Sequence, residues 1–448
     1  MLRPSAEPTD HRARPTRFRY VVLAGLCLAA AFAYVSRNSL SAAESTVRKD
    51  LGLTKEDTRW IIMGFFLTYA AGQIPSGQIG HRWGTRRSLP LFSTLGSFAT
   101  AAFAMAPGWV ALTASRMLMG AAQAGYFPCT TITIGKWFPK REQAMANGVL
   151  ASAMSVGGAV GVAVTGALVV DVGWRAIFLL YALPGLLWAA WFHRIFRDRP
   201  EQHPSPNPAE LDWIREGRPA VAAANGSDGD AGARVPWLAL FASPVLWLIC
   251  AQQFCRAAGY MFYASWFATF LQESRGVSIA GAGLLSSLPL LATILGGPCG
   301  GRLSDGLMVR TGNPRLARQS VAIGSMLGCA LLIFAAYPIQ NPTLAVLVIS
   351  GGAFCAAFGG PISYTITIDM GGRHVAPVFS TMNMAGNIGA VAFPYVVPDI
   401  LEWSGQNWNA VVLLFGGLYV AAAACWGLLD PRGTVLERSL WTSAGRSV

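Results

Sequence analysis

Apolar segments of about 20 residues recur along the whole chain, and they constrain its fold more than any other feature. Segments of this length can cross a lipid bilayer as α-helices. Of the 448 residues, 53% are hydrophobic and only 12% are charged, whereas soluble proteins carry about 25% charged residues. The sequence therefore predicts an all-α, polytopic membrane protein with about twelve spans, near residues 20–43, 58–80, 88–106, 109–134, 143–169, 174–196, 240–271, 281–303, 317–338, 342–368, 377–400 and 408–429.

The net charge of +12 is distributed unevenly between the loops. If the N-terminus is cytoplasmic, the lysines and arginines fall mainly in loops on the cytoplasmic side, which is the positive-inside pattern of membrane proteins. We therefore expect a multi-pass protein of the cell membrane, plasma or inner, with both termini in the cytoplasm. Because topology explains the basic charge, no nucleic-acid partner is expected.

A polar segment divides the spans into two groups of six. Residues 197–239 are rich in Pro, Gly, Asn and charge, which is typical of a linker. Two halves of this kind favour a parallel repeat, with the substrate site between the halves near the middle of the membrane. The expected organisation is a basic cytoplasmic tail (1–19), an N-terminal six-helix bundle (20–196), a cytoplasmic linker (197–239), a C-terminal six-helix bundle (240–430) and a cytoplasmic tail (431–448).

The sequence shows no pattern typical of an enzyme, a metal centre or a cofactor site. The eight cysteines lie in apolar segments, and none has a CxxC spacing. No two histidines have metal-ligand spacing, and no GxxxxGK[ST] motif occurs. Catalytic residues, metal ligands and cofactors are therefore not expected. A membrane enzyme and a non-transporting membrane sensor are the alternatives from other functional classes.

Arg37 lies well inside the first apolar segment, with no carboxylate beside it. An arginine there costs roughly 2.5–3.5 kcal/mol of insertion free energy, and it cannot lose its charge by deprotonation. Such a residue usually faces a cavity on the path of a substrate or ion. Since a planar guanidinium can hold a carboxylate through two parallel hydrogen bonds, Arg37 is the candidate clamp for an organic anion. The alternative is a structural arginine paired with backbone carbonyls or with Glu44, which lies two helical turns away on the same face.

The motifs of the inner loops resemble those of the major facilitator superfamily. The loop Gly77-Gln-Ile-Gly-His-Arg-Trp-Gly-Thr-Arg-Arg87 resembles the superfamily's GxxxDRxGRR signature, with His81 at the acidic position. Asp305 supplies the acid in the second copy of the motif. The resemblance implies a major facilitator fold of two six-helix bundles. It also implies a charge latch between cytoplasmic helix ends, with Gly77, Arg82, Gly84, Arg86, Arg87 and Asp305 as its residues.

More specifically, the chain resembles the anion:cation symporter family of sugar-acid and organic-anion carriers. The matching stretches include Tyr34-Val-Ser-Arg37 in the first span, Tyr69-Ala-Ala-Gly-Gln73 in the second, and residues 116–128 in the fourth. The resemblance implies a secondary transporter that moves a small carboxylate or sugar acid across the lipid bilayer by alternating access. Tyr34, Arg37, Tyr69 and Asn383 match polar substrate-side positions of the family, and Arg116, Gln123 and Tyr364 complete the candidate substrate-binding residues; Arg256 is considered further.

Two departures from the family bear on ion coupling. Its sugar-acid carriers have an aspartate just before the first-span arginine and a glutamate seven residues after the fourth-span arginine, and both acids are implicated in proton coupling. Here these positions hold Ser36 and Gln123, which do not titrate in the useful range. We therefore expect exchange for a counter-anion, or facilitated diffusion. The alternative is proton-coupled symport through another acid such as Glu44.

Overall fold

The computed structural model describes residues 14–216, 235–277 and 279–437. Within these ranges the secondary structure is helical, and each of the twelve predicted spans contains helix. The predicted all-α fold class is therefore confirmed. The helices before the linker are α1 (Phe18–Asp50), α2 (Lys55–Trp83), α3 (Thr85–Met105), α4 (Trp109–Gln123), α5 (Tyr126–Trp137), α6 (Gln143–Val172) and α7 (Trp174–Ile195).

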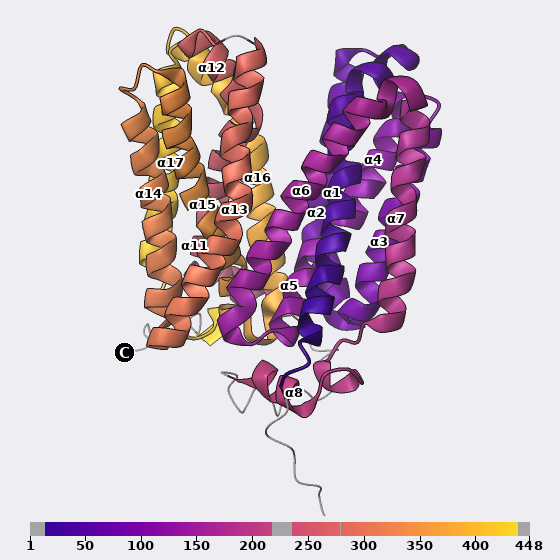
Figure 1. The fold of residues 1–448 in the computed structure, drawn as a ribbon, viewed down its shortest axis with the longest axis vertical. Coiled ribbons are helices and arrows are strands. Elements are labelled where there is room, and N and C mark those ends of the chain that lie inside the picture. The colour runs from indigo at the N-terminus through magenta and orange to yellow at the C-terminus, as the bar shows by residue number, and fades with distance from the viewer. Residues whose placement is uncertain (1–13, 217–234, 278, 438–448) are drawn as a thin grey trace, which may run out of the picture.

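The linker contributes one short helix, α8 (Pro208–Arg215), and the remaining helices follow it. Figure 1 shows α1–α7 gathered in one group and α11–α17 in a second group, whose ribbons meet at the end where α8 lies and diverge at the other end. The later helices are α10 (Trp237–Phe241), α11 (Pro244–Met261), α12 (Phe267–Arg275), α13 (Ile279–Thr311), α14 (Ser320–Ala336), α15 (Pro342–Gly371), α16 (Val375–Trp403) and α17 (Trp408–Leu428).

Three spans differ from a simple apolar helix. In the described part of the chain, nine helices are long and apolar enough to cross a membrane by length and composition alone. The fourth span is broken between α4 and α5, and the seventh contains a π-helical turn at Phe262–Trp266 between α11 and α12. The second span, α2, is continuous over 29 residues but carries more polar side chains. Hydropathy alone therefore understates the number of spans.

Glycines allow close helix packing within and between the two groups. A Cβ added at Gly157 or Gly161 of α6 would collide with the backbone of α1, and one at Gly148 would lie 2.6 Å from the Gly297 carbonyl oxygen of α13. Small residues at such positions let helices in membranes approach one another closely. Gly157 and Gly161 thus hold α6 against α1 within one group, whereas Gly148 lets α6 contact α13 of the other group.

The second copy of the inner-loop motif joins the two groups through charge. Asp305 of α13 accepts hydrogen bonds from the backbone N–H groups of Met145 (2.8 Å) and Ala144 (3.4 Å), at the start of α6. Its other partner is Arg318, at 2.7 Å, and Arg318 also pairs with Asp369 at 3.3 Å. Carboxylates at a helix N-terminus are stabilised by its unpaired N–H groups. The motif thus connects α13, α15 and α6 at one end of the molecule.

In the first copy of the motif, the carboxylate comes from outside the motif. Asp198 accepts hydrogen bonds from the Thr85 hydroxyl (3.0 Å) and the Arg86 backbone N–H (2.9 Å) at the start of α3. Gly84 has a φ of 77° and a Cβ there would collide with Asp198, so glycine is needed for this approach. Arg82 and Arg87 are exposed. Inspection of the sequence missed Asp198, because it lies more than 100 residues after the loop that it contacts.

Gly77 marks another contact between the two groups. A Cβ added at Gly77 of α2 would collide with the Ser380 hydroxyl of α16 and would lie 3.3 Å from the Ala376 carbonyl oxygen. The two helices therefore touch at this glycine, and a larger side chain would force them apart.

The folded part of the linker packs on the start of α1. Glu210 of α8 is fully buried and accepts hydrogen bonds from the backbone N–H groups of Phe18 (2.9 Å) and Arg19 (3.1 Å). Burial alone would raise the pKa of Glu210, but hydrogen bonds from Thr16, Arg19 and Phe18 lower it below its ordinary value. Arg19 also pairs with Glu142 at 2.9 Å. The linker helix therefore caps α1 and ties it to the segment before α6.

We expect Arg318→Gln to lower the apparent melting temperature of the purified protein strongly. Arg318 is fully buried between two carboxylates, and removing one partner of a buried ion pair costs about 3–5 kcal/mol. The matched control is Arg315→Gln, because Arg315 is 48% exposed and pairs with Asp430 at 2.6 Å. Exposed pairs contribute about 0–1 kcal/mol. Equal melting temperatures for the two variants would contradict this assignment.

Candidate functional site

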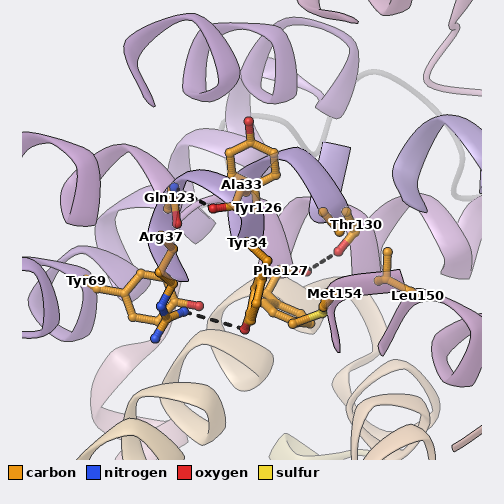
Figure 2. A pocket seen from close by; sticks show the side chains of 11 residues that line it. Ala33, Tyr34, Arg37, Tyr69, Gln123, Tyr126, Phe127, Thr130, Leu150 and Met154 are labelled. Carbon is orange, nitrogen blue, oxygen red and sulfur yellow. Dashed lines mark hydrogen bonds between the residues drawn. The ribbon is translucent and has the colours of Figure 1, made fainter. Parts of the chain in front are cut away.

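A pocket with about 330 Å³ of empty space lies beside Arg37 among the helices before the linker (Figure 2). Its walls come from α1, α2, α4, α5 and α6. Four of the candidate residues, Tyr34, Arg37, Tyr69 and Gln123, lie on it together. The complete lining is Ala30, Ala33, Tyr34, Arg37, Tyr69, Gln123, Tyr126, Phe127, Thr130, Leu150 and Met154.

Arg37 is surrounded by aromatic rings. Its guanidinium carbon lies 4.7 Å from the ring centroid of Phe65, 4.9 Å from Tyr69, 5.1 Å from Phe66 and 5.2 Å from Tyr34. One guanidinium N–H group also faces the Tyr34 hydroxyl at 3.5 Å. Aromatic faces attract a cation without neutralising it. The guanidinium is therefore held in place while its charge stays available to an anion.

Glu44, the alternative partner of Arg37, is engaged elsewhere. It pairs with Arg48 one helical turn further along α1, with 2.9 Å between the carboxylate oxygen and the guanidinium nitrogen. Both side chains are 28% exposed. Among the ion pairs of the described residues, none includes Arg37. The expected alternative pairing of Arg37 with Glu44 is therefore not formed in this structure.

Arg116 lies behind Arg37 and is not on the pocket wall. It is 3% exposed, and two of its N–H groups point at the Arg37 carbonyl oxygen at 3.4 Å. Its guanidinium carbon lies 4.9 Å from the centroid of the Phe65 ring. The same ring, on α2, also contacts Arg37. Its Nε has no hydrogen-bond partner among the described residues. Arg116 therefore adds positive potential to the site without touching the pocket.

Ser36 and Gln123 hydrogen-bond with one another beside the pocket. The Gln123 amide donates to the Ala33 carbonyl oxygen (3.1 Å, Figure 2) and to the Ser36 hydroxyl (3.4 Å). The Ser36 hydroxyl donates to the same carbonyl oxygen at 3.0 Å. A serine–glutamine pair of this kind is neutral and carries no exchangeable charge. The position expected for coupling acids is thus filled by a neutral network.

Tyr364 and Arg256 approach the pocket from the helices after the linker. The Tyr364 ring of α15 lies 5.6 Å from the ring of Phe127, which lines the pocket. Arg256 of α11 bonds to the Gln253 side-chain oxygen through two nitrogens, at 3.2 and 3.1 Å. A Cβ added at Gly360 would lie 3.6 Å from an Arg256 guanidinium nitrogen, so the guanidinium lies against the backbone of α15.

Asn383 lies outside the pocket lining, on α16, together with other polar groups that have no bonding partner. It is 8% exposed, and its amide nitrogen has no partner among the described residues. The same holds for both amide atoms of the fully buried Gln73 on α2, and for the Ser380 hydroxyl. Buried polar groups are normally hydrogen-bonded. These groups can therefore receive water or substrate hydroxyls.

Sequence inspection gave no separate role to Gln73, although it lies in a quoted motif. The sequence did contain a sign of such a role, because burying an amide in the middle of a span is costly when it has no hydrogen-bond partner. What could not be read from the sequence is that α2 and α16 touch one helical turn away, at Gly77 and Ser380, and that Gln73 and Asn383 are both buried with amide atoms that have no partner among the described residues.

The chain is similar in sequence to known transporters. The sequence model of the Major Facilitator Superfamily matches residues 26–305 and 249–445. The probable sulfoacetate transporter of Cupriavidus necator is 28% identical over 419 residues, covering 93% of this chain and 95% of that protein. The probable galactarate/D-glucarate transporter of Escherichia coli K12 is 28% identical over 416 residues, covering 90% and 91%. The hexuronate transporter of Bacillus subtilis is 25% identical over 407 residues, covering 90% and 92%.

Solved structures share the fold. A proton:xylose symporter bound to 6-bromo-6-deoxy-D-glucose superposes with a TM-score of 0.69 at 13% identity, covering 95% of this chain and 99% of that one. The human organic anion transporter TETRAN superposes with a TM-score of 0.66 at 15% identity, covering 91% and 99%. The chain therefore belongs to the major facilitator superfamily, and it is a transporter rather than a membrane enzyme.

Proposed function

We propose that this transporter moves a small organic anion, a carboxylate or sugar acid, with Arg37 as its main charge clamp. The observation that carries the proposal is a half-buried guanidinium on the wall of a pocket, held by four aromatic rings. The relatives named as transporters of sulfoacetate, galactarate/D-glucarate and hexuronate support an organic-acid substrate.

Polar side chains around the pocket suit the rest of such a substrate. Tyr34 and Tyr69 supply hydroxyls on the pocket wall, and Tyr364 lies next to it from the second helix group. Asn383 offers an unpaired amide on α16. Tyrosine hydroxyls and amides can each donate and accept hydrogen bonds. We assign these residues to substrate recognition, together with Gln123 on the pocket wall and Arg116 behind it.

We propose that the helix groups before and after the linker act as two rigid bundles, residues 20–196 and 240–430, in the cell membrane, with both termini cytoplasmic. The basic residues at the α8 end support this orientation. The contacts of Asp305, Arg318 and Gly77 then close the cytoplasmic side. The conformation is thus the one closed to the cytoplasm, and the latch must open for release.

We also propose that the carrier exchanges one anion for another, or lets an anion diffuse down its gradient. Support comes from the neutral pair of Ser36 and Gln123 beside Arg37, and from the surface pairing of Glu44 with Arg48. Without a titrating acid at the clamp, no deprotonated carboxylate can replace the substrate as the partner of the positive charge.

The site is expected to prefer an acid over its parent neutral sugar. D-galactonate should bind at least about tenfold more tightly than D-galactose, because a charge-assisted hydrogen bond is worth about 1.5–3 kcal/mol and 1.4 kcal/mol is a factor of ten. Calorimetry on the protein in lipid nanodiscs measures both affinities, and D-glucuronate against D-glucose provides a second pair. Equal affinity for acid and sugar in both pairs would refute the anion clamp.

A further inference from the structure

We infer that the transported anion carries two acid groups, one held by Arg37 before the linker and the other by Arg256 after it. This inference rests on the proposed function and narrows its substrate class. It follows from the placement of a second arginine that, like Arg37, has no carboxylate partner among the described residues.

The two arginines occupy related positions in the two halves of the chain. Arg37 lies in the first long helix before the linker, α1, and Arg256 in the first long helix after it, α11. In a parallel repeat such helices are related by an axis along the membrane normal. Each arginine also has a polar partner three residues earlier, Tyr34 at 3.5 Å and Gln253 at 3.1 Å. Each of the two helix groups thus contributes one arginine of this kind.

Tyr364 links the neighbourhood of Arg256 to the pocket. The Arg256 guanidinium lies against the backbone of α15 at Gly360, and Tyr364 follows one helical turn later on that helix. The Tyr364 ring lies 5.6 Å from the ring of Phe127, which lines the pocket together with Arg37. A ligand that extends from Arg37 past Phe127 and Tyr364 therefore approaches Arg256.

The charge around the pocket favours two negative groups over one. Arg37, Arg116 and Arg256 are three cations, and none is in an ion pair among the described residues. Arg256 contacts the side-chain amide oxygen of Gln253, which is neutral and does not compensate its charge. Burying a charge without a counter-charge is costly. A monoanion leaves two of the three charges uncompensated, whereas a dianion leaves one.

A dianion would also act on both helix groups. Arg37 and Arg256 belong to different groups, so an acid at each end of the substrate attracts the groups toward one another. A monoanion held by Arg37 alone exerts no such attraction on α11. Closure of the site around the substrate thus depends on the second acid.

The test compares a diacid with a monoacid on the same carbon skeleton. Galactarate carries a carboxylate at both ends, and galactonate at one. We expect wild-type protein in nanodiscs to bind galactarate at least about tenfold more tightly. Arg256→Gln should bring the galactarate affinity down to that of galactonate while changing galactonate binding less than about threefold. Arg256→Lys, which keeps the charge, should retain part of the preference.

Two further measurements make the outcome decisive. Sulfoacetate against acetate repeats the comparison with a smaller pair, and the melting profile of each variant reports its folding. If Arg256→Gln does not fold, the diacid-to-monoacid affinity ratios of the wild type and of Arg256→Lys still test the inference. Equal affinity within both pairs, or a preference that survives in folded Arg256→Gln, overturns the inference and leaves the anion clamp intact. Binding of none of these acids overturns the proposed function as well.

Discussion

Replacing Arg37 by alanine is expected to remove nearly all transport, and replacing it by lysine is expected to remove most of it. The guanidinium is held by four aromatic rings and faces the pocket without a carboxylate partner. Two charge-assisted hydrogen bonds to a carboxylate are worth about 3–6 kcal/mol together, so the alanine variant should lose at least about a hundredfold in substrate affinity. Lysine keeps the charge but cannot form the paired hydrogen bonds or stack as a plane.

The measurement is uptake of labelled galactonate or galactarate into proteoliposomes that contain equal amounts of each variant. Arg48→Ala is the matched control, because Arg48 lies on the same helix but is partly exposed and already pairs with Glu44 at 2.9 Å. It should transport at nearly the wild-type rate. Wild-type uptake by correctly inserted Arg37→Ala would show that the clamp lies elsewhere.

The sequence was sufficient to predict the twelve spans, because the cost of exposing a polar backbone to lipid leaves few alternatives to a helix. It was less informative about helix ends. The first span was predicted to end at Ala43, but α1 continues to Asp50. The added turns carry charged residues, including the Glu44–Arg48 pair. Hydropathy indicates which residues lie in the hydrocarbon core of the bilayer. A helix, however, ends where its backbone hydrogen bonds and caps end.

The candidate site was predictable where its residues share one helix group. Tyr34, Arg37, Tyr69 and Gln123 lie in three spans before the linker, and the structure brings them onto one pocket. Contacts between distant segments were not predictable in the same way. Asp198 takes the acidic role in the first inner-loop motif, although nothing near His81 in the sequence indicates it.

Arg116 shows a further limit of the sequence. As a cation in an apolar segment it has the same pattern as Arg37, so both were candidate ligands. Only the packing distinguishes them, since Arg116 is 3% exposed behind Phe65 and Arg37 lies on the pocket wall. The sequence thus indicates two cations in apolar segments, whereas the fold decides which arginine lies on the pocket wall.

Uptake by the wild-type protein is expected to be much faster when an anion is present on the opposite side of the membrane, and to ignore a proton gradient. In the empty carrier Arg37 and Arg116 have no carboxylate partner within the described residues, and Ser36 and Gln123 beside them do not titrate. Reorientation with this charge unpaired is slow, because a desolvated charge without a partner is costly. A loss of 1.4 kcal/mol already slows a step tenfold. Exchange should therefore exceed net uptake by at least about tenfold.

The experiment uses proteoliposomes loaded either with unlabelled galactonate or with buffer, each with and without an inward proton gradient, and follows labelled galactonate. Loaded vesicles should take up label rapidly under both pH conditions, and Glu44→Gln should behave like the wild type because Glu44 already pairs with Arg48. The double variant Ser36→Asp, Gln123→Glu places two acids beside Arg37, so its uptake should become dependent on the proton gradient. Concentrative uptake by the wild type into empty vesicles, driven by the proton gradient alone and abolished in Glu44→Gln, would establish proton symport and refute exchange.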